Sequence, residues 1–306
     1  MKPSIWVERY RPKVISEVIF QDERQRTAFE NFVANGDIPH LLLSGVQGTG
    51  KTTISKALIR DLKVERSDVM RINCSDEKID ALRNKVSGFA MTMPLGKFKV
   101  VQLEEFDYLS QDGQALLRSL IEDTSGTCRF IATCNYENKV MPPLRSRFQQ
   151  FYFKAPDKER IVMRMVEILE AEKIDFDPEY LLTYIDVGYP DIRKTIQLLQ
   201  GNISNGKLLN PSQVANSDAD WKFGLLEAIT KCDFKKARKL VCESATREEH
   251  EDVFTFLYQN IDKITFKSKD GTDSAIITIN EFMVKHNQVA DTELNLAAMM
   301  ISLSRI

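Results

Sequence analysis

Residues 45–52 read GVQGTGKT and directly follow the apolar run Leu41–Ser44. They match G-x-x-x-x-G-K-[ST], the phosphate-binding loop that joins a buried strand to a helix. Glycines let the backbone N–H groups of such a loop turn towards phosphate oxygens, and the helix adds its positive N-terminal end. Apolar residues then recur at helical spacing, at Ile54, Ala57, Leu58 and Leu62. The stretch therefore predicts a nucleoside triphosphate site at a strand–helix junction.

The side chains of this loop have distinct predicted roles. Lys51 reaches the β- and γ-phosphates, and the Thr52 hydroxyl is a magnesium ligand. The expected cofactors are ATP and Mg²⁺. The expected nucleotide-binding residues of the loop are Gly45, Gln47, Gly48, Thr49, Gly50, Lys51, Thr52 and Thr53.

A group of acids ends the apolar run in VVQLEEFDYL (100–109), at Glu104, Glu105 and Asp107. In ATPases with this loop, one acid at the tip of a later strand orients magnesium, and the next activates the attacking water. We therefore assign Glu104 to the metal and Glu105 to catalysis. Position 104 normally carries aspartate, so a working site, a disabled site and a plain polar strand end are all possible. Because magnesium keeps several waters, a contact through water absorbs the extra methylene, and we expect a working site with weakened magnesium affinity.

Strand-like and helical segments alternate in the first half of the chain. Strands are expected at 41–44, 68–73, 98–103 and 128–133, with helices such as 76–90 and 111–122 between them. This alternation predicts a parallel sheet covered by helices on both faces.

The second half reads helical to its last residue, with no convincing strand. Asp157 is a plausible N-cap and Pro178 opens another helix, whereas the polar stretch 201–220 separates a small helical domain from a larger one. The expected domains are 1–154, 155–212 and 213–306.

Composition narrows the class of protein. A chain of 306 residues with 43% hydrophobic and 28% charged residues is typical of a soluble protein of two or three domains. No apolar run is long enough to span a membrane, and the N-terminus lacks a secretory signal, so we expect a cytoplasmic protein. A net charge of −2 argues against a globally basic nucleic-acid binder but permits a local basic patch.

The five cysteines are scattered, and none forms a C-x-x-C pair. Neither a disulfide framework nor a zinc site is indicated. We expect reduced thiols in the protein core.

Several motifs occur together, in order, along nearly the whole chain. They are WVERYRPK (6–13), IPHLLLSGVQGTGKTT (38–53), INCSDEKIDALRNKV (72–86), IATCN (131–135), PPLRSRF (142–148), GYPDIRKTIQLLQ (188–200) and ADTELNLAAMMISL (290–303). In combination they resemble a clamp-loader AAA+ ATPase subunit of the replication factor C small-subunit and T-even phage type. The resemblance implies an α/β P-loop AAA+ domain with a parallel sheet, a small helical lid domain and an all-α collar domain.

The resemblance also implies roles around the nucleotide. Asn135 occupies the sensor-1 position, Arg147 is the arginine finger for a neighbouring subunit, and Arg193 is sensor 2. The segment holding Tyr10, Arg11 and Pro12 packs on adenine in that family. The sequence departs from the family's pattern at Glu104, at Phe148 in place of a cysteine, and at Val46 and Gln47 in the loop.

Further roles follow from the same resemblance. Arg83 and Lys85, after a helix start expected at Ser75 or Asp76, correspond to a helix that tracks DNA phosphates. Gln114 and Arg118 match positions that couple DNA binding to the ATP site. The sliding clamp would bind at an apolar, Met-rich segment that includes Phe89, Met93 and Leu95.

The leading hypothesis is an ATPase subunit that opens a sliding clamp and loads it onto primer–template DNA, with DNA and clamp stimulating hydrolysis of ATP to ADP and phosphate. Expected partners are the clamp, the DNA, other copies of the chain and a distinct subunit, in a pentameric open ring without membrane or zinc. The alternatives are a weakly hydrolysing scaffold subunit and another AAA+ DNA remodeller, such as a helicase loader. A small-molecule kinase would leave Asn135, Arg147 and Arg193 without a role. The C-terminal segment resembles the phage version, and this resemblance and the lack of a zinc cysteine set favour a phage source. The protein would then act in the host cytoplasm.

Overall fold

The computed structural model describes residues 5–76, 79–211, 221–246, 249–266, 270–286 and 288–306. The chain divides into two compact units. The sheet unit comprises Met1–Arg164 with Pro190–Ile196, and the helical unit comprises Met165–Tyr189 with Gln197–Ile306. The three-domain division 1–154, 155–212 and 213–306 stays a prediction.

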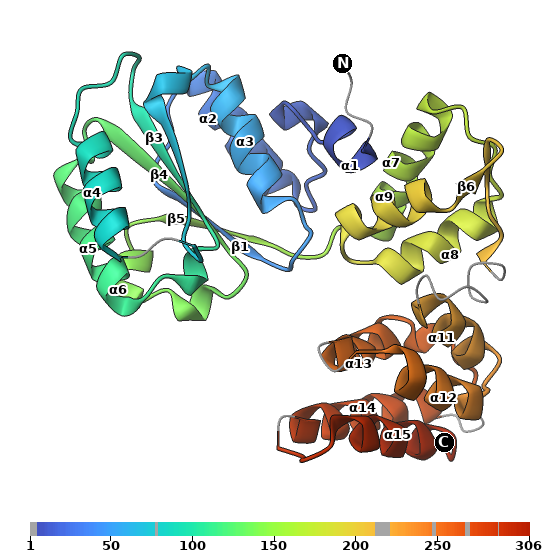
Figure 1. Cartoon of the computed structure of the whole chain (residues 1–306). Helices are drawn as coiled ribbons and strands as arrows, with labels where there is room; N and C mark the ends of the chain where they lie inside the picture. The colour runs from blue at the N-terminus through green and yellow to red at the C-terminus, as the bar shows by residue number, and fades with distance from the viewer. Residues whose placement is uncertain (1–4, 77–78, 212–220, 247–248, 267–269, 287) are drawn as a thin grey trace. The chain divides into compact units, whose positions relative to one another are not determined.

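The sheet unit is built on five parallel strands in the order β2-β3-β4-β1-β5 (Figure 1). Their bounds are β1 Leu41–Gly45, β2 Val69–Asn73, β3 Lys99–Glu104, β4 Cys128–Cys134 and β5 Gln149–Phe153. The first four confirm the predicted strands. The prediction missed β5, which pairs only with β1, so its outer edge lies at the border of the sheet.

Helices cover both faces of this sheet, as predicted. On one face α2 (Glu23–Asn35) and α3 (Lys51–Asp61) pack on the sheet, and on the other α4 (Ile79–Ala90), α5 (Gln111–Asp123) and α6 (Pro142–Arg145) do so (Figure 1). Alternate residues of β1 feed the two cores, because successive strand side chains point to opposite faces. Leu41 and Leu43 pack on the α2–α3 side, and Leu42 packs on the α4–α5 side.

Short helical elements and one long helix complete the sheet unit. They are α1 Trp6–Arg9, η1 Ile15–Glu17, η2 Arg66–Asp68, η3 Phe106–Tyr108, η4 Glu137–Lys139 and the first part of α7 Lys158–Ala171. The Asp157 carboxylate accepts the Glu159 N–H at 3.2 Å, as expected of an N-cap at α7.

The helical unit contains nearly only helices. Their bounds are α8 Pro178–Gly188, α9 Ile192–Gly201 (shared with the sheet unit), α11 Trp221–Thr230, α12 Phe234–Ser244, α13 His250–Gln259, η6 Ile261–Lys263, α14 Gly271–His286 and α15 Thr292–Leu303. Pro178 opens α8, as predicted. Over the described ranges, no helix is both long enough and apolar enough to cross a bilayer.

Two details of the second half correct the sequence-based expectations. A small hairpin, β6 (Ile203–Ser204) with β7 (Lys207–Leu208), lies where no strand was expected. Its turn residues Asn205 and Gly206 both have positive φ, a pattern typical of tight hairpins. The last helix ends at Leu303, before the chain does. Residues 74–76 form a turn and the described part of α4 begins at Ile79, so the helix start expected at Ser75 or Asp76 stays a prediction.

The cysteines agree with the expected core thiols only in part. Cys74, Cys128 and Cys134 are buried, and burial raises the pKa of each thiol to about 12. Cys232 is exposed and Cys242 is half-buried, so these two are not core residues.

The end of β1 depends on a glycine. Gly45 has φ +133°, and a Cβ built there would lie 2.0 Å from the carbonyl oxygen of Phe153 on β5. Any side chain would therefore push apart the two strands that carry the phosphate loop. By contrast, a Cβ at Gly88, within α4, would meet nothing within 4 Å.

We expect Gly45→Ala to lower the free energy of unfolding by roughly 2–4 kcal/mol, because the clash is with backbone and the φ is unfavourable for alanine. Gly88→Ala is the control and should raise it by roughly 0.5–1 kcal/mol, since alanine is the better helix former. Urea unfolding followed by circular dichroism measures both. Equal stability of Gly45→Ala and the natural protein would contradict the packing described here.

Candidate nucleotide site

A cavity of about 330 Å³ lies in the sheet unit, at the carboxyl ends of β1, β3 and β4. This edge is where open α/β sheets bind ligands. The cavity brings together most of the predicted site residues, namely Tyr10, Arg11, Pro12, Gln47, Gly48, Thr49, Gly50, Lys51, Thr52, Thr53, Glu104, Glu105, Asn135 and Arg193. Gly45 does not line it and lies behind the loop, against β5.

The phosphate loop is held in shape by its own lysine. The buried Lys51 ammonium donates to the carbonyls of Gly45 at 2.8 Å and Val46 at 2.7 Å. Gly48 and Gly50 have φ of +78° and +88°. Gly50 is the N-cap residue of α3, so no side chain caps the first N–H groups of this helix. The first N–H groups of α3 are therefore available to an anion, as a phosphate site requires.

A second glycine of the loop is fixed by close approach. A Cβ at Gly48 would lie 2.2 Å from the Asp191 carboxyl carbon, just ahead of α9. The same carboxylate lies 3.6 Å from the Arg193 guanidinium, which is 51% exposed. Asp191 thus links the loop to the predicted sensor-2 arginine, a contact that motif reasoning did not reveal.

The two predicted catalytic acids differ in their surroundings. Glu104, at the end of β3, is half-buried and lies 3.6 Å from the Lys56 ammonium. Glu105 is exposed and adopts a left-handed backbone with φ +55°. That conformation costs a non-glycine residue about 1–2 kcal/mol and is concentrated at functional sites. The strand therefore ends abruptly at the residue expected to activate water.

Asp107 has a structural role that the spacing of the acids did not predict. Its Oδ2 accepts the backbone N–H groups of Asn135 at 3.3 Å and Tyr136 at 3.2 Å. This carboxylate holds the turn after β4, and with it the predicted sensor. Its other oxygen, Oδ1, is buried and has no partner among the described residues.

The residues of the cavity fit a magnesium–nucleotide complex. Magnesium prefers hard oxygen ligands and retains waters. The Thr52 hydroxyl and the carboxylates of Glu104 and Asp107 supply such oxygens in one cavity, and the unpartnered Asp107 Oδ1 is an acceptor that a metal-bound water would satisfy.

Comparison with known proteins identifies the class. Residues 41–155 match the model of the ATPase family associated with various cellular activities (AAA). The replication factor C small subunit of Archaeoglobus fulgidus is 35% identical over 314 residues, covering 99% of this chain and 98% of the relative. The chain belongs to the replication factor C small-subunit family. It is a clamp-loader AAA+ subunit and an ATPase.

Further comparisons agree with this family. The replication factor C small subunit of Picrophilus torridus is 39% identical over 216 residues, which cover 69% of this chain and 67% of the relative. Among solved structures, the Thermotoga maritima RuvB Holliday junction branch migration motor has a TM-score of 0.59 at 16% identity. That likeness covers 87% of this chain and 97% of the other, and at such low identity it shows the fold alone.

In this replication factor C family member, Arg147 lies away from the chain's own nucleotide cavity. Its guanidinium Nε donates to Glu122 at 2.7 Å, and its Nη1 donates to the Pro143 carbonyl. It lines a separate surface recess with His40, Ser125 and Arg129. A finger for a neighbour's nucleotide must lie outside its own cavity, so this placement agrees with the predicted role without testing it.

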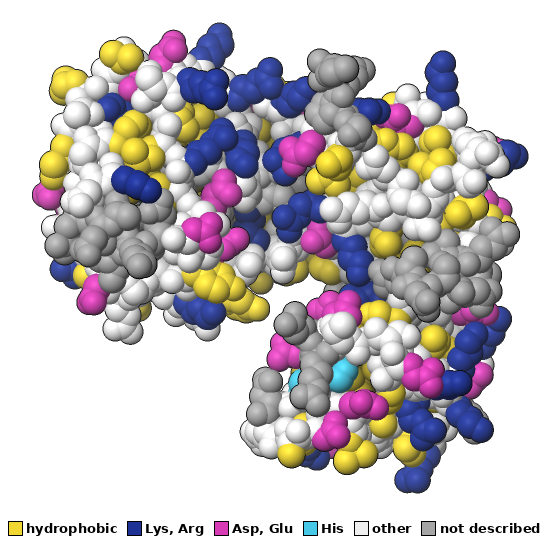
Figure 2. Space-filling model, in the orientation of Figure 1, with side chains coloured by type: hydrophobic (Ala, Val, Ile, Leu, Met, Phe, Trp, Pro, Cys, Tyr) yellow, Lys and Arg dark blue, Asp and Glu magenta, His cyan; other side chains and the backbone are white. Residues whose placement is uncertain are grey.

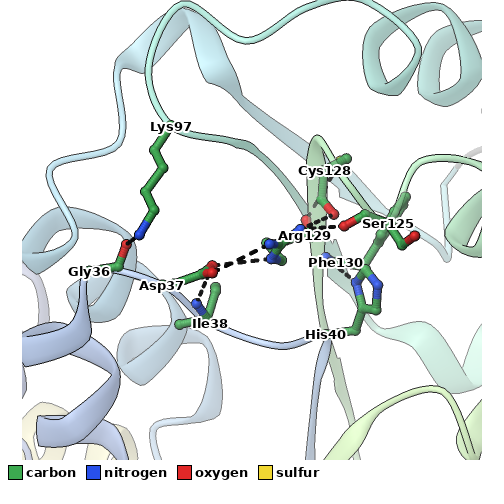
Figure 3. Close-up of polar contacts among 9 residues, drawn as sticks. All are labelled: Gly36, Asp37, Ile38, His40, Lys97, Ser125, Cys128, Arg129 and Phe130. Carbon is green, nitrogen blue, oxygen red and sulfur yellow. Dashed lines mark hydrogen bonds and ion pairs between the residues drawn. The ribbon is translucent and has the colours of Figure 1, made fainter.

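The recess beside Arg147 is braced by Arg129 (Figure 3). The Arg129 guanidinium bonds the Asp37 carboxylate and the carbonyls of Ser125 and Cys128. These contacts join the turn before β1 to the turn before β4. The Arg129 guanidinium therefore has a structural role. Burial and, to a smaller extent, the nearby Arg129 charge together lower the pKa of His40 to about 4, so His40 is neutral at pH 7.

Gln114 and Arg118, the predicted coupling pair, differ in environment. Gln114 is buried on α5, and its amide donates to the carbonyls of Leu109 at 3.0 Å and Lys139 at 3.1 Å. Its oxygen accepts the Met141 N–H at 2.8 Å. Gln114 thus joins the loop after the acids to the loop after Asn135. Arg118 is exposed on the same helix.

The predicted DNA and clamp residues receive unequal structural support. Lys85 is exposed on α4, and the Arg83 side chain lies outside the described part of the structure. Met93 and Leu95 are 79% and 80% exposed, as a partner surface requires. Phe89 is instead half-buried and packs against the α4–α5 core, so these three side chains do not form one exposed surface.

A local basic cluster occurs in the helical unit. Figure 2 shows Lys and Arg side chains gathered over α12, which carries Lys235, Lys236, Arg238 and Lys239. Two of these are near acids, Lys236 3.6 Å from Glu227 and Lys239 3.9 Å from Glu243. The positive charge of the cluster is therefore partly neutralised by these neighbouring acids.

Nucleotide affinity should fall as pH rises above 8. Burial lowers the pKa of Lys51 to about 8 in the nucleotide-free protein, whereas phosphate oxygens favour the charged ammonium and raise it in the complex. Binding then takes up a proton above pH 8, and affinity should decline by up to about tenfold per pH unit. Fluorescence titration with an ATP analogue between pH 7 and 10 measures this slope.

Lys51→Arg is the matched control, because a guanidinium stays charged throughout this range. Its nucleotide affinity, although weaker overall, should not show the extra decline above pH 8. If the natural protein and Lys51→Arg lost nucleotide affinity with pH in the same way, the decline above pH 8 could not come from the Lys51 ammonium.

Proposed function

We propose that this subunit uses ATP binding and hydrolysis to open a sliding clamp and load it onto primer–template DNA. One observation carries the proposal. The chain has a nucleotide cavity with loop, acids and sensor, yet its candidate finger Arg147 lies outside that cavity. A site of this kind is completed by a neighbouring copy, and head-to-tail copies form rings or spirals.

Within the cavity, the residues have separable roles. Lys51 and the N–H groups of the loop bind the phosphates, while Thr52 and Glu104 hold magnesium. When bound, magnesium would neutralise the negative charge that develops during phosphoryl transfer. Glu105 takes the proton of the attacking water. Asn135 positions that water, and Asp107 holds Asn135 in place by accepting its backbone N–H. Tyr10, Arg11 and Pro12 line the adenine end, and Arg193 connects α9 to the nucleotide.

DNA and clamp act on this cavity through the sheet unit. Arg83 and Lys85 on α4 contact DNA phosphates, which makes binding independent of sequence and sensitive to salt. Arg118 on α5 helps to couple DNA binding to the ATP site. Gln114 carries the effect to the sensor loop through its bonds to Lys139 and Met141. Met93 and Leu95 contact the clamp.

Several copies of this chain and one distinct subunit make up a pentameric open ring in the cytoplasm. A weakly hydrolysing scaffold subunit is the second candidate, and the Lys56–Glu104 ion pair favours it because that pair competes with magnesium. The AAA+ fold alone also suits another DNA remodeller.

The decisive experiment measures ATPase activity of the assembled complex with clamp and primed DNA added separately and together. A loader should respond strongly only to both. Activity that ignores the clamp would favour another remodeller, and activity that stays low under all conditions would favour the scaffold.

Arg147→Ala should lower the stimulated ATPase rate by about 10³-fold or more, because the finger stabilises transition-state charge in the neighbour's site. ATP binding by the isolated subunit should be unchanged. Arg145→Ala, two residues earlier and half-buried on α6, is the control and should retain the stimulated rate. Loss of activity in both variants alike would show a structural effect instead.

Glu105→Gln should bind ATP with unchanged affinity but hydrolyse it about 10²–10⁴-fold more slowly, since the amide cannot accept the proton of water. Equilibrium binding and single-turnover hydrolysis separate the two effects. Hydrolysis at the natural rate would exclude Glu105 as the base.

A further inference from the structure

We infer that Lys56 is a positioning residue that holds Glu104 and sets how strongly the site binds magnesium. The inference rests on the proposed role of Glu104 at magnesium. It assigns to this subunit a built-in partner for the unusual glutamate, supplied by the helix that follows the phosphate loop.

Lys56 is placed for this task by the periodicity of α3. It follows Thr52 by four residues, so both side chains lie on one face of the helix, and both line the nucleotide cavity. The Lys56 ammonium lies 3.6 Å from Glu104 Oε1, and the two side chains are 28% and 29% exposed. The pair is thus within ion-pair distance and partly shielded from solvent.

Gln102 makes a second contact with the same carboxylate oxygen. It lies two residues before Glu104 on β3, so both side chains point to the same face of the sheet. Its Nε2 donates to Glu104 Oε1 at 3.1 Å, whereas its own Oε1 is buried without a partner among the described residues. Both contacts fall on Oε1, which leaves Oε2 to accept from a metal-bound water.

The length of the side chain at position 104 decides whether its carboxylate can reach Lys56. Aspartate at 104 is one methylene shorter, so its carboxylate would stop short of the Lys56 ammonium. Glutamate reaches the ammonium and is held by it, which removes rotamer freedom from the longer side chain. The ammonium also neutralises the carboxylate that would attract magnesium, so the pair should orient Glu104 while weakening magnesium binding.

The test measures affinity for a fluorescent ATP analogue in saturating Mg²⁺ and in EDTA, and compares the ratio of the two affinities. In Lys56→Met this ratio should rise about fivefold, because the ammonium no longer neutralises the Glu104 carboxylate. Affinity in EDTA should change less than twofold. Lys56→Arg keeps the charge and should keep the natural ratio.

Arg60→Met is the matched control, since Arg60 is an exposed cation on the same helix that does not line the cavity. Its ratio should equal that of the natural protein. Thermal unfolding of each variant checks the fold, and Lys56→Gln serves if the methionine variant is unstable.

A double-mutant cycle tests the contact itself. Glu104→Asp alone should raise the ratio, and Lys56→Met in that background should change it less than twofold further, because the contact is already lost. Additive effects would show that the two residues act independently and would overturn the inference.

Two other results would also overturn it. A tenfold loss of affinity in EDTA for Lys56→Met would mean that Lys56 binds phosphate directly. An unchanged ratio would mean that the ion pair has no influence on the metal. Neither result depends on clamp or DNA, so failure of the loading function would be seen separately, in the clamp-stimulated ATPase assay.

Discussion

The two hydrogen bonds from the Lys51 ammonium to the carbonyls of Gly45 and Val46 hold the phosphate loop, and the rest of the site is arranged around that loop. They keep a buried charge paired while no phosphate is bound, because burying an unpaired ammonium would be costly. The loop can keep this shape only if Gly45 lies directly against Phe153 on β5. A nucleotide would therefore meet a loop that is already curved, and the lysine would exchange carbonyl oxygens for phosphate oxygens.

Much of the sheet unit could be predicted from local pattern, because its central strands are apolar runs and its helices have clear periodicity. β5 could not, since QQFYF begins with two exposed glutamines and gains its order from pairing with β1. The β6–β7 hairpin was missed because its strands are two residues long, although the Asn205–Gly206 turn is a recognisable signal. Where local pattern is weak, tertiary contacts decide the structure.

The nucleotide site shows the same division. The positions of the loop and the acids at one edge were predictable because each follows a strand, and the carboxyl ends of parallel strands meet there. The expected role of Asn135 came from the family resemblance. Contacts between elements were not predictable from spacing. Asp107 holding the Asn135 backbone and Asp191 filling the space at Gly48 both depend on how separate elements pack. The residues expected to carry chemistry were therefore visible in the sequence, whereas the residues that position them were not.

The bonds of Gln114 have a consequence for how several sites would work together. Segment 135–147 runs from the predicted sensor of one site to the finger proposed for the next. Gln114 is bonded near the middle of this segment, at Lys139 and Met141. In a ring of such copies, this covalent segment would connect each site to the site of its neighbour. Neighbouring sites would then influence each other through the chain itself, without any subunit sensing the whole ring.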